Sequence, residues 1–327
     1  MNSFIVNTSN LVINWIKKYA FLLIKISVGV GLLTYLIHKI SFRTIIESLN
    51  SVNLFYLSLA FLLAVLNIYL QFYRWKILVK NEISFQDDKS ILKSLLIGFS
   101  AGTFTPARAG EYFLRKLTLK DLSLSSVITL TFIDKMMLLI NVVFWGALVS
   151  FGMMIFYYNV DAYVTVSLFI IFATFFAALF MIMYSRRFYN YLRELKSRFN
   201  FKLSFLKKLF EPLSDLNNQL ISKLILIAFM NYIIIVLQFS LIVFSFNSNA
   251  NFELLIIASI MVYFTKTLIP SVTLGEIGIR EGAAIYFFGL FGCSEVAAFN
   301  SSMLLFIFNL LLPSVIGLYL LLRLKRV

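Results

Sequence analysis

Two short motifs carry a glutamate and an arginine on the same spacing, in opposite halves of the chain. Glu111 is followed four residues later by Arg115, and Glu276 is followed four residues later by Arg280. Side chains four residues apart share one face of a helix, so each glutamate can pair with its arginine. Such a pair supports two kinds of chemistry: an arginine binds an anionic group, and a glutamate accepts or passes on a proton.

Further basic residues lie close to the two motifs in the sequence, namely Arg108, Lys135 and Lys266. Basic side chains combined with the N-termini of short helices form a binding site for phosphate, because free N–H groups and the positive end of the helix dipole point at the anion. The apolar sequence around both motifs suits acyl or prenyl tails. We therefore expect a site for a phosphate-bearing lipid.

A structural role for these charges is the competing interpretation. Two internal Glu–Arg ion pairs would lower the free energy needed to bury the charges, and would only hold the chain in place. Against this, charge at depth in a membrane is expensive and usually marks a transport path. Asp134-Lys135 has the same two interpretations: an anchor at the interface, or a countercharge or proton site that faces the first motif. The second is favoured.

The composition is typical of an all-α, polytopic integral membrane protein. Of 327 residues, 61% are hydrophobic and 13% are charged, whereas soluble domains carry about 25% charged residues. The apolar runs exceed the ~20 residues that cross a bilayer as a helix. Lipid offers no hydrogen-bond partners, so the backbone groups of a span must pair with one another, as they do in a helix. Six spanning helices are predicted, over 19–38, 53–73, 131–156, 163–184, 220–246 and 295–322. We interpret the first as a retained helix rather than a signal peptide, since no cleavage site of small residues follows it.

Two apolar segments before the motifs are too short to cross the membrane, and each runs into a proline. Segments of this length are typical of re-entrant structure, and proline ends a helix. We therefore expect two re-entrant helical hairpins, over 90–122 and 252–292. The residues expected to shape their turns are Pro106, Gly110, Pro270, Gly275 and Gly278.

Charge in the loops predicts the orientation of a single membrane domain over 1–327. The loop 186–219 is the richest in Lys and Arg, so we expect a basic amphipathic loop on the cytoplasmic membrane surface. Alternation of the spans then places both termini in the cytoplasm. The halves 53–156 and 220–322 run in opposite directions, and the two motifs lie about half a chain length apart. This pattern predicts an inverted repeat whose hairpins enter from opposite sides and meet near the midplane.

The residue inventory excludes several classes of site. His38 is the only histidine and Cys293 the only cysteine, so no disulfide within the chain and no Cys/His metal cluster can form. No Walker-type phosphate loop is present. The basic loop lies between two spans, which favours an anionic membrane surface over nucleic acid as its partner. We expect no metal, no cofactor and no catalytic residue.

The motifs resemble those of the flippase-like family named for the transmembrane region of lysylphosphatidylglycerol synthases. The first is similar to a P-x-R-x-G-E motif followed by a basic residue, here Pro106, Arg108, Gly110, Glu111 and Arg115. The second is similar to P-x-x-G-G-x-G-x-R-E, here Pro270, Gly275, Gly278, Arg280 and Glu281. This chain departs from the family in having Gly275-Glu276 in place of the paired glycine, and Asp134-Lys135 where Glu-Arg is more frequent.

The resemblance implies a multi-pass protein of the bacterial inner membrane that moves a lipid between leaflets. Larger relatives add a cytoplasmic aminoacyl-transferase domain; this chain ends at Val327, so we expect no lipid aminoacylation from it. Motifs and resemblance together predict these substrate-binding residues: Arg108, Glu111, Arg115, Asp134, Lys135, Lys266, Glu276, Arg280 and Glu281.

Three functions stay open at this point. The first is a flippase for an anionic, aminoacyl or glycosylated phospholipid, or for a polyprenyl-linked lipid, driven by a gradient or by protons through Glu111, Glu276 or Asp134. The second is a membrane-embedded transferase that acts on a lipid-linked sugar, with Glu111 or Glu276 as general base. The third is a non-catalytic partner of a separate synthase or glycosyltransferase. A homo-oligomer is compatible with all three.

Overall fold

The computed structural model describes residues 34, 38, 42–84, 86–103, 105, 108–184, 217–269 and 278–324. Every regular element within these ranges is a helix, as the sequence predicted. Nearly all of the predicted first span, 19–38, and of the basic loop, 186–219, lies outside the described residues.

Five helical segments in the described part of the chain are long and apolar enough to cross a membrane. They correspond to five of the six predicted spans. Their bounds are α3 (Leu54–Glu82), α6 (Leu124–Phe156), α7 (Ala162–Tyr184), α10 (Asn218–Phe246), and the continuous run of α13 (Glu295–Phe306), the π-helix η4 (Ile307–Leu311) and α14 (Leu312–Leu324).

Two of these helices extend well beyond the predicted spans, by more than a turn. Helix α3 continues past position 73 to Glu82, and α6 begins at Leu124 rather than at 131. The prediction ended α3 at its first charged residue, but that residue, Arg74, is paired with Asp134 inside the protein. The start of α6 is fixed by a cap, because the Ser123 hydroxyl accepts a hydrogen bond from the backbone N–H of Ser126 at 3.0 Å.

The first motif lies on a helical hairpin. Helix α4 (Asp88–Thr103) leads to α5 (Ala109–Leu114) and the 3-10 helix η2 (Arg115–Thr118). The Ser94 hydroxyl donates to the Arg115 carbonyl oxygen at 2.7 Å, and the Thr118 hydroxyl donates to the Ser90 carbonyl oxygen at 2.9 Å. These bonds show that the second arm returns along α4.

Two glycines of α4 allow the arms of this hairpin to approach closely. A Cβ atom at Gly98 would lie 2.8 Å from the Arg115 Cγ atom. A Cβ atom at Gly102 would lie 3.3 Å from both the Arg108 Nε and the Glu111 Oε2 atoms. The absence of a side chain on this face of α4 therefore makes room for the charged residues of the motif.

The second motif lies between α11 (Phe252–Leu268) and α12 (Ile279–Leu290), which pack against each other. The connecting residues 270–277 lie outside the described residues, and with them Pro270, Gly275 and Glu276. Helix α12 follows Gly278, whose φ of 103° is a conformation that glycine adopts readily. An apolar core holds this half together, with Phe239 and Phe288 in edge-to-face contact at 5.0 Å between ring centroids.

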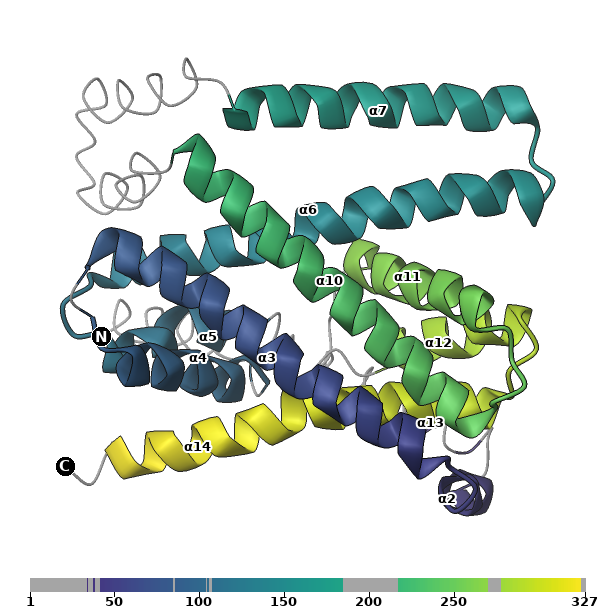
Figure 1. The fold of residues 1–327 in the computed structure, drawn as a ribbon, viewed down its shortest axis with the longest axis horizontal. Coiled ribbons are helices and arrows are strands. Elements are labelled where there is room, and N and C mark those ends of the chain that lie inside the picture. Colours follow the sequence, from purple (N-terminus) through teal and green to yellow (C-terminus); the bar gives the residue numbers. More distant parts are fainter. Residues whose placement is uncertain are drawn as a thin grey trace, which may run out of the picture.

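The two halves meet along a pair of crossing helices. Helices α3 and α10 lie side by side through the middle of the molecule, with α4 and α5 toward one end and α11, α12 and α13 toward the other (Figure 1). Helix α14 packs along α4, and α6 and α7 form the upper edge in this view. The short helix α2 (Phe42–Leu49) lies against α13, where the Asn300 side chain donates to the Ile45 carbonyl oxygen at 2.9 Å.

Candidate functional site

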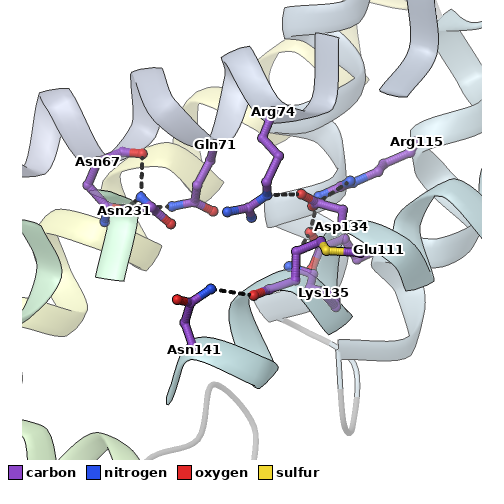
Figure 2. A network of polar contacts seen from close by, with 10 residues as sticks. Asn67, Gln71, Arg74, Glu111, Arg115, Asp134, Lys135, Asn141 and Asn231 are labelled. Carbon is purple, nitrogen blue, oxygen red and sulfur yellow. Dashed lines mark hydrogen bonds and ion pairs between the residues drawn. The ribbon is translucent and has the colours of Figure 1, made fainter. Parts of the chain in front are cut away.

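Two carboxylates tie the first hairpin to the spanning helices α3 and α6 (Figure 2). Asp134 on α6 accepts from the Arg74 Nε atom at 2.5 Å and from Arg115 at 3.3 Å. Glu111 on α5 accepts from Arg115 at 2.5 Å and from the Lys135 ammonium group at 2.8 Å. The Glu111–Arg115 pair and the Asp134-Lys135 countercharge facing the first hairpin are both as predicted.

Arg115 is fully buried within this network. Its guanidinium carbon lies 4.3 Å from the centroid of the Trp75 ring, on the side of α3 next to Arg74. A guanidinium over an indole face gains a cation–π interaction that partly replaces water. Arg115 is therefore held by two carboxylates and an aromatic ring.

Arg108 connects the same network to an open space. It precedes α5 with φ of 56°, a left-handed conformation uncommon for a residue other than glycine. Its Nε atom lies 3.2 Å from the Glu111 Oε2 atom. The Arg108 guanidinium carbon lies 5.9 Å from the centroid of the Phe99 ring on α4, and the side chain lines the cavity described below.

In the second motif, the neighbouring residues Arg280 and Glu281 form an ion pair with each other. The Arg280 guanidinium lies 2.6 Å from the Glu281 Oε1 atom, and the other oxygen of Glu281 accepts from the Gly278 backbone N–H at 2.6 Å. Ser302 on α13 accepts from the Arg280 Nε atom at 2.8 Å and donates to Glu281 at 3.0 Å. Glu281 is therefore both the partner of Arg280 and a cap for the start of α12.

A cavity of about 150 Å³ lies where the two halves meet. Its described wall contains no Asp and no Glu side chain. The basic residues that line it are Arg74, Arg108, Lys135, Lys266 and Arg280. The first three belong to the first half and the last two to the second, so cations from both motifs face one space.

Amide side chains complete the polar wall of the cavity. Asn67 on α3 donates to Asn309 at 2.6 Å and accepts from Asn231 on α10 at 2.5 Å. Gln71 donates to the same Asn67 oxygen at 3.2 Å. Asn309 lies in the π-helix η4, whose extra residue per turn widens the helix at this point. The wall therefore joins α3, α10 and η4 through neutral hydrogen bonds.

The family model for the lysylphosphatidylglycerol synthase TM region matches residues 22–317. The chain belongs to this family. The match confirms the resemblance drawn from the two motifs and, together with the five apolar helices, indicates a multi-pass membrane protein. No curated protein matches the chain.

Within this member of the lysylphosphatidylglycerol synthase TM region family, the predicted site residues fall into three groups. Arg108, Lys135, Lys266 and Arg280 line the cavity. Glu111, Arg115, Asp134 and Glu281 are buried in the ion pairs behind it. The remaining predicted residue, Glu276, lies outside the described residues, as does the turn residue Pro106.

The predicted pairing of Glu276 with Arg280 stays a prediction, because Glu276 lies outside the described residues. Helix α12 begins at Ile279, after Gly278, whose φ of 103° is not helical. Within the described residues, Arg280 forms an ion pair with its neighbour Glu281.

Arg74 and the four amides were missed by the sequence reasoning. Arg74 stood at the end of an apolar run, where a charge usually marks the interface. The amides are single polar residues in apolar helices, a pattern that also arises from simple helix packing. Three polar residues at helical spacing on α3, Asn67, Gln71 and Arg74, were the available signal.

Proposed function

We propose that this protein binds the phosphate-bearing headgroup of a membrane lipid in the cavity between its halves and moves that lipid between leaflets. One observation carries the proposal. Five basic side chains from both halves line one cavity within a bundle of apolar helices, and none of its described wall residues is acidic. Guanidinium and ammonium groups in this arrangement match the oxygens of a phosphate.

The ion pairs behind the cavity support a binding role for the cations in front. Glu111 and Asp134 each accept from more than one cation, so they fix the positions of Arg74, Arg108 and Lys135. The Arg74 Nη1 atom is buried and has no hydrogen-bond partner among the described residues. A buried donor of this kind is costly unless a ligand or water accepts from it.

The topology we propose follows from the loop charges. The hairpins of α4–α5 and α11–α12 are re-entrant, they enter the bilayer from opposite sides, and the two halves form an inverted repeat. Both termini lie on the cytoplasmic side of a bacterial inner membrane. The cavity then lies near the midplane, where a headgroup crossing the bilayer needs polar contacts most.

Glu111 is better suited to positioning than to general-base catalysis. It is fully buried, and Arg108, Arg115 and Lys135 lie within ion-pair distance of its oxygens. A general base must reach the proton that it abstracts, and this carboxylate is behind the cations that line the cavity. We therefore place the first motif in headgroup binding.

A leaflet-accessibility assay in liposomes tests this proposal. Purified full-length protein is reconstituted with fluorescent phosphatidylglycerol, and a membrane-impermeant reductant bleaches only the outer leaflet. We expect Lys266→Gln to slow the exchange of label between leaflets about tenfold, because a charged hydrogen bond contributes roughly 1.5–3 kcal/mol.

Lys223→Gln is the matched control, since Lys223 on α10 is exposed and does not line the cavity. It should exchange lipid at the wild-type rate. Equal rates for Lys266→Gln, Lys135→Gln and the wild type would remove the support for a cationic headgroup site.

A further inference from the structure

A second hollow lies next to the cationic cavity, and its wall is apolar. It has a volume of about 200 Å³ and is formed by residues of α6, α10 and α11, among them Trp145, Val236 and Ile260. Tyr232 contributes the only hydroxyl group of the described wall. We call this hollow the apolar groove.

The apolar groove continues the cavity along the same three helices. On α6, Val142 lines the cavity and Trp145 lines the groove. On α11, Tyr263 lines the cavity and Ile260 lines the groove. Three residues of helix advance by about 5 Å, so the two hollows adjoin within one turn. A single molecule with a polar and an apolar end can therefore occupy both.

Tyr232 on α10 lines the apolar groove, and the preceding residue, Asn231, lines the cavity. Only 3% of the Tyr232 surface is exposed. Its hydroxyl group is buried and has no hydrogen-bond partner among the described residues. A buried donor without a partner is unfavourable, and an oxygen atom of a ligand would satisfy it.

We propose that the apolar groove binds one acyl chain of the same lipid whose phosphate lies in the cationic cavity, with the Tyr232 hydroxyl donating to an ester oxygen at the head of that chain. This inference rests on the proposed function, and it defines the substrate class as a phospholipid with an ester-linked chain. The order from the cavity through Tyr232 to the rest of the groove is then the order along the lipid: phosphate, ester and hydrocarbon.

Photolabelling of the full-length protein in nanodiscs tests the inference. The probe is phosphatidylglycerol with a diazirine in one acyl chain, and labelled positions are mapped by mass spectrometry. We expect label on the groove walls of α6, α10 and α11. Ile260→Trp fills the groove and should lower this labelling about tenfold.

Ile170→Trp is the matched control, because Ile170 is 58% exposed on α7, which contributes nothing to the groove. It should label like the wild type. Tyr232→Phe removes one hydroxyl group and leaves the shape intact, so it should fold normally and lower labelling about threefold, the effect of one neutral hydrogen bond. Wild-type labelling in both Ile260→Trp and Tyr232→Phe would overturn the inference.

A third variant separates this inference from the proposed function. Lys266→Gln should lower labelling in the groove, since the headgroup holds the chain there. If Lys266→Gln lowers labelling and Ile260→Trp does not, the headgroup site stands and the groove is not its extension. If Ile260→Trp lowers labelling and Lys266→Gln does not, the groove binds bulk lipid only, and the joint site is overturned.

Discussion

The two motifs each contain a buried glutamate in the described part of the chain, Glu111 and Glu281, and differ in how the protein holds it. Glu111 is surrounded by cations from its own hairpin and from α6, and the neighbouring Asp134 extends the network to α3. Glu281 pairs with the adjacent Arg280, caps its own helix, and otherwise meets the neutral Ser302. The described ion pairs of the first motif join different helices, whereas the described ion pair of the second lies within α12 and is hydrogen-bonded to Ser302 of α13.

This difference assigns different structural roles to the two hairpins. The first cannot move relative to α3 and α6 without breaking buried ion pairs, which is strongly unfavourable in a low-dielectric interior. The second contacts the apolar core around Phe239 and Phe288, so its described contacts with other helices are mainly van der Waals packing.

The largest expected effect is the loss of the carboxylate from the first motif. Glu111→Gln leaves Arg108, Arg115 and Lys135 near a neutral amide, so we expect it to lower the free energy of unfolding by about 3–5 kcal/mol. Denaturant titration in mixed micelles measures this change.

Glu281→Gln is the matched substitution in the second motif. Among the described residues, only Arg280 loses an ion-pair partner, and the amide oxygen can still accept from either Gly278 or Ser302, so the expected loss is about 1–3 kcal/mol. A loss as large as that of Glu111→Gln would show that the two motifs are anchored alike.

Two glycine substitutions, one in each hairpin, test the same comparison, and their expected effects on stability are of intermediate size. Gly98→Ala places a Cβ atom 2.8 Å from the Arg115 Cγ atom, and overpacking of this kind lowers stability by about 1–3 kcal/mol. Gly282→Ala on α12 meets nothing within 4 Å and should be neutral or stabilising by up to about 1 kcal/mol. The same titration measures both, and a destabilised Gly282→Ala would contradict the open packing of the second motif.

The smallest expected effect on stability concerns Asp88, at the start of the first hairpin. Asp88 begins α4 and accepts hydrogen bonds from Lys76 and Lys80, which hold the pKa of its carboxyl group below the usual value. A lowered pKa in the folded state stabilises the protein above the unfolded pKa of about 4, and this contribution is lost as the pH falls through the folded value.

Asp88→Asn should therefore lower the thermal midpoint slightly at pH 7, and the difference from wild type should shrink below about pH 4. Thermal scans over a pH series measure it. A difference that persists unchanged in acid would mean that the Asp88 charge does not contribute.

Local features of this protein could be predicted from its sequence because neighbouring residues determine them. The apolar runs gave the spans, and the four-residue spacing gave the Glu111–Arg115 pair, which the structure contains. The start of α12 was also a local feature, but it depended on whether the helix began before or after Gly278. A glycine next to a charged motif permits either start.

Contacts between distant segments could not be predicted in the same way. Arg74 and Asp134 are far apart in the sequence, and nothing in either segment alone specifies their ion pair. Asn67, Asn231 and Asn309 meet only because three helices cross at one level. The predicted midplane site named cations from both halves, and the packing of α3 against α10 decides which of them line the cavity.

Photolabelling from the headgroup tests the central claim, that one headgroup contacts cations of both halves, most directly. Full-length protein is reconstituted with a phosphatidylglycerol analogue whose headgroup carries a diazirine, with and without excess unlabelled lipid. Our account predicts saturable labelling of residues near Arg108 and Lys135 and also of residues near Lys266 and Arg280. Labelling confined to one half, or labelling that excess lipid does not compete away, would contradict it.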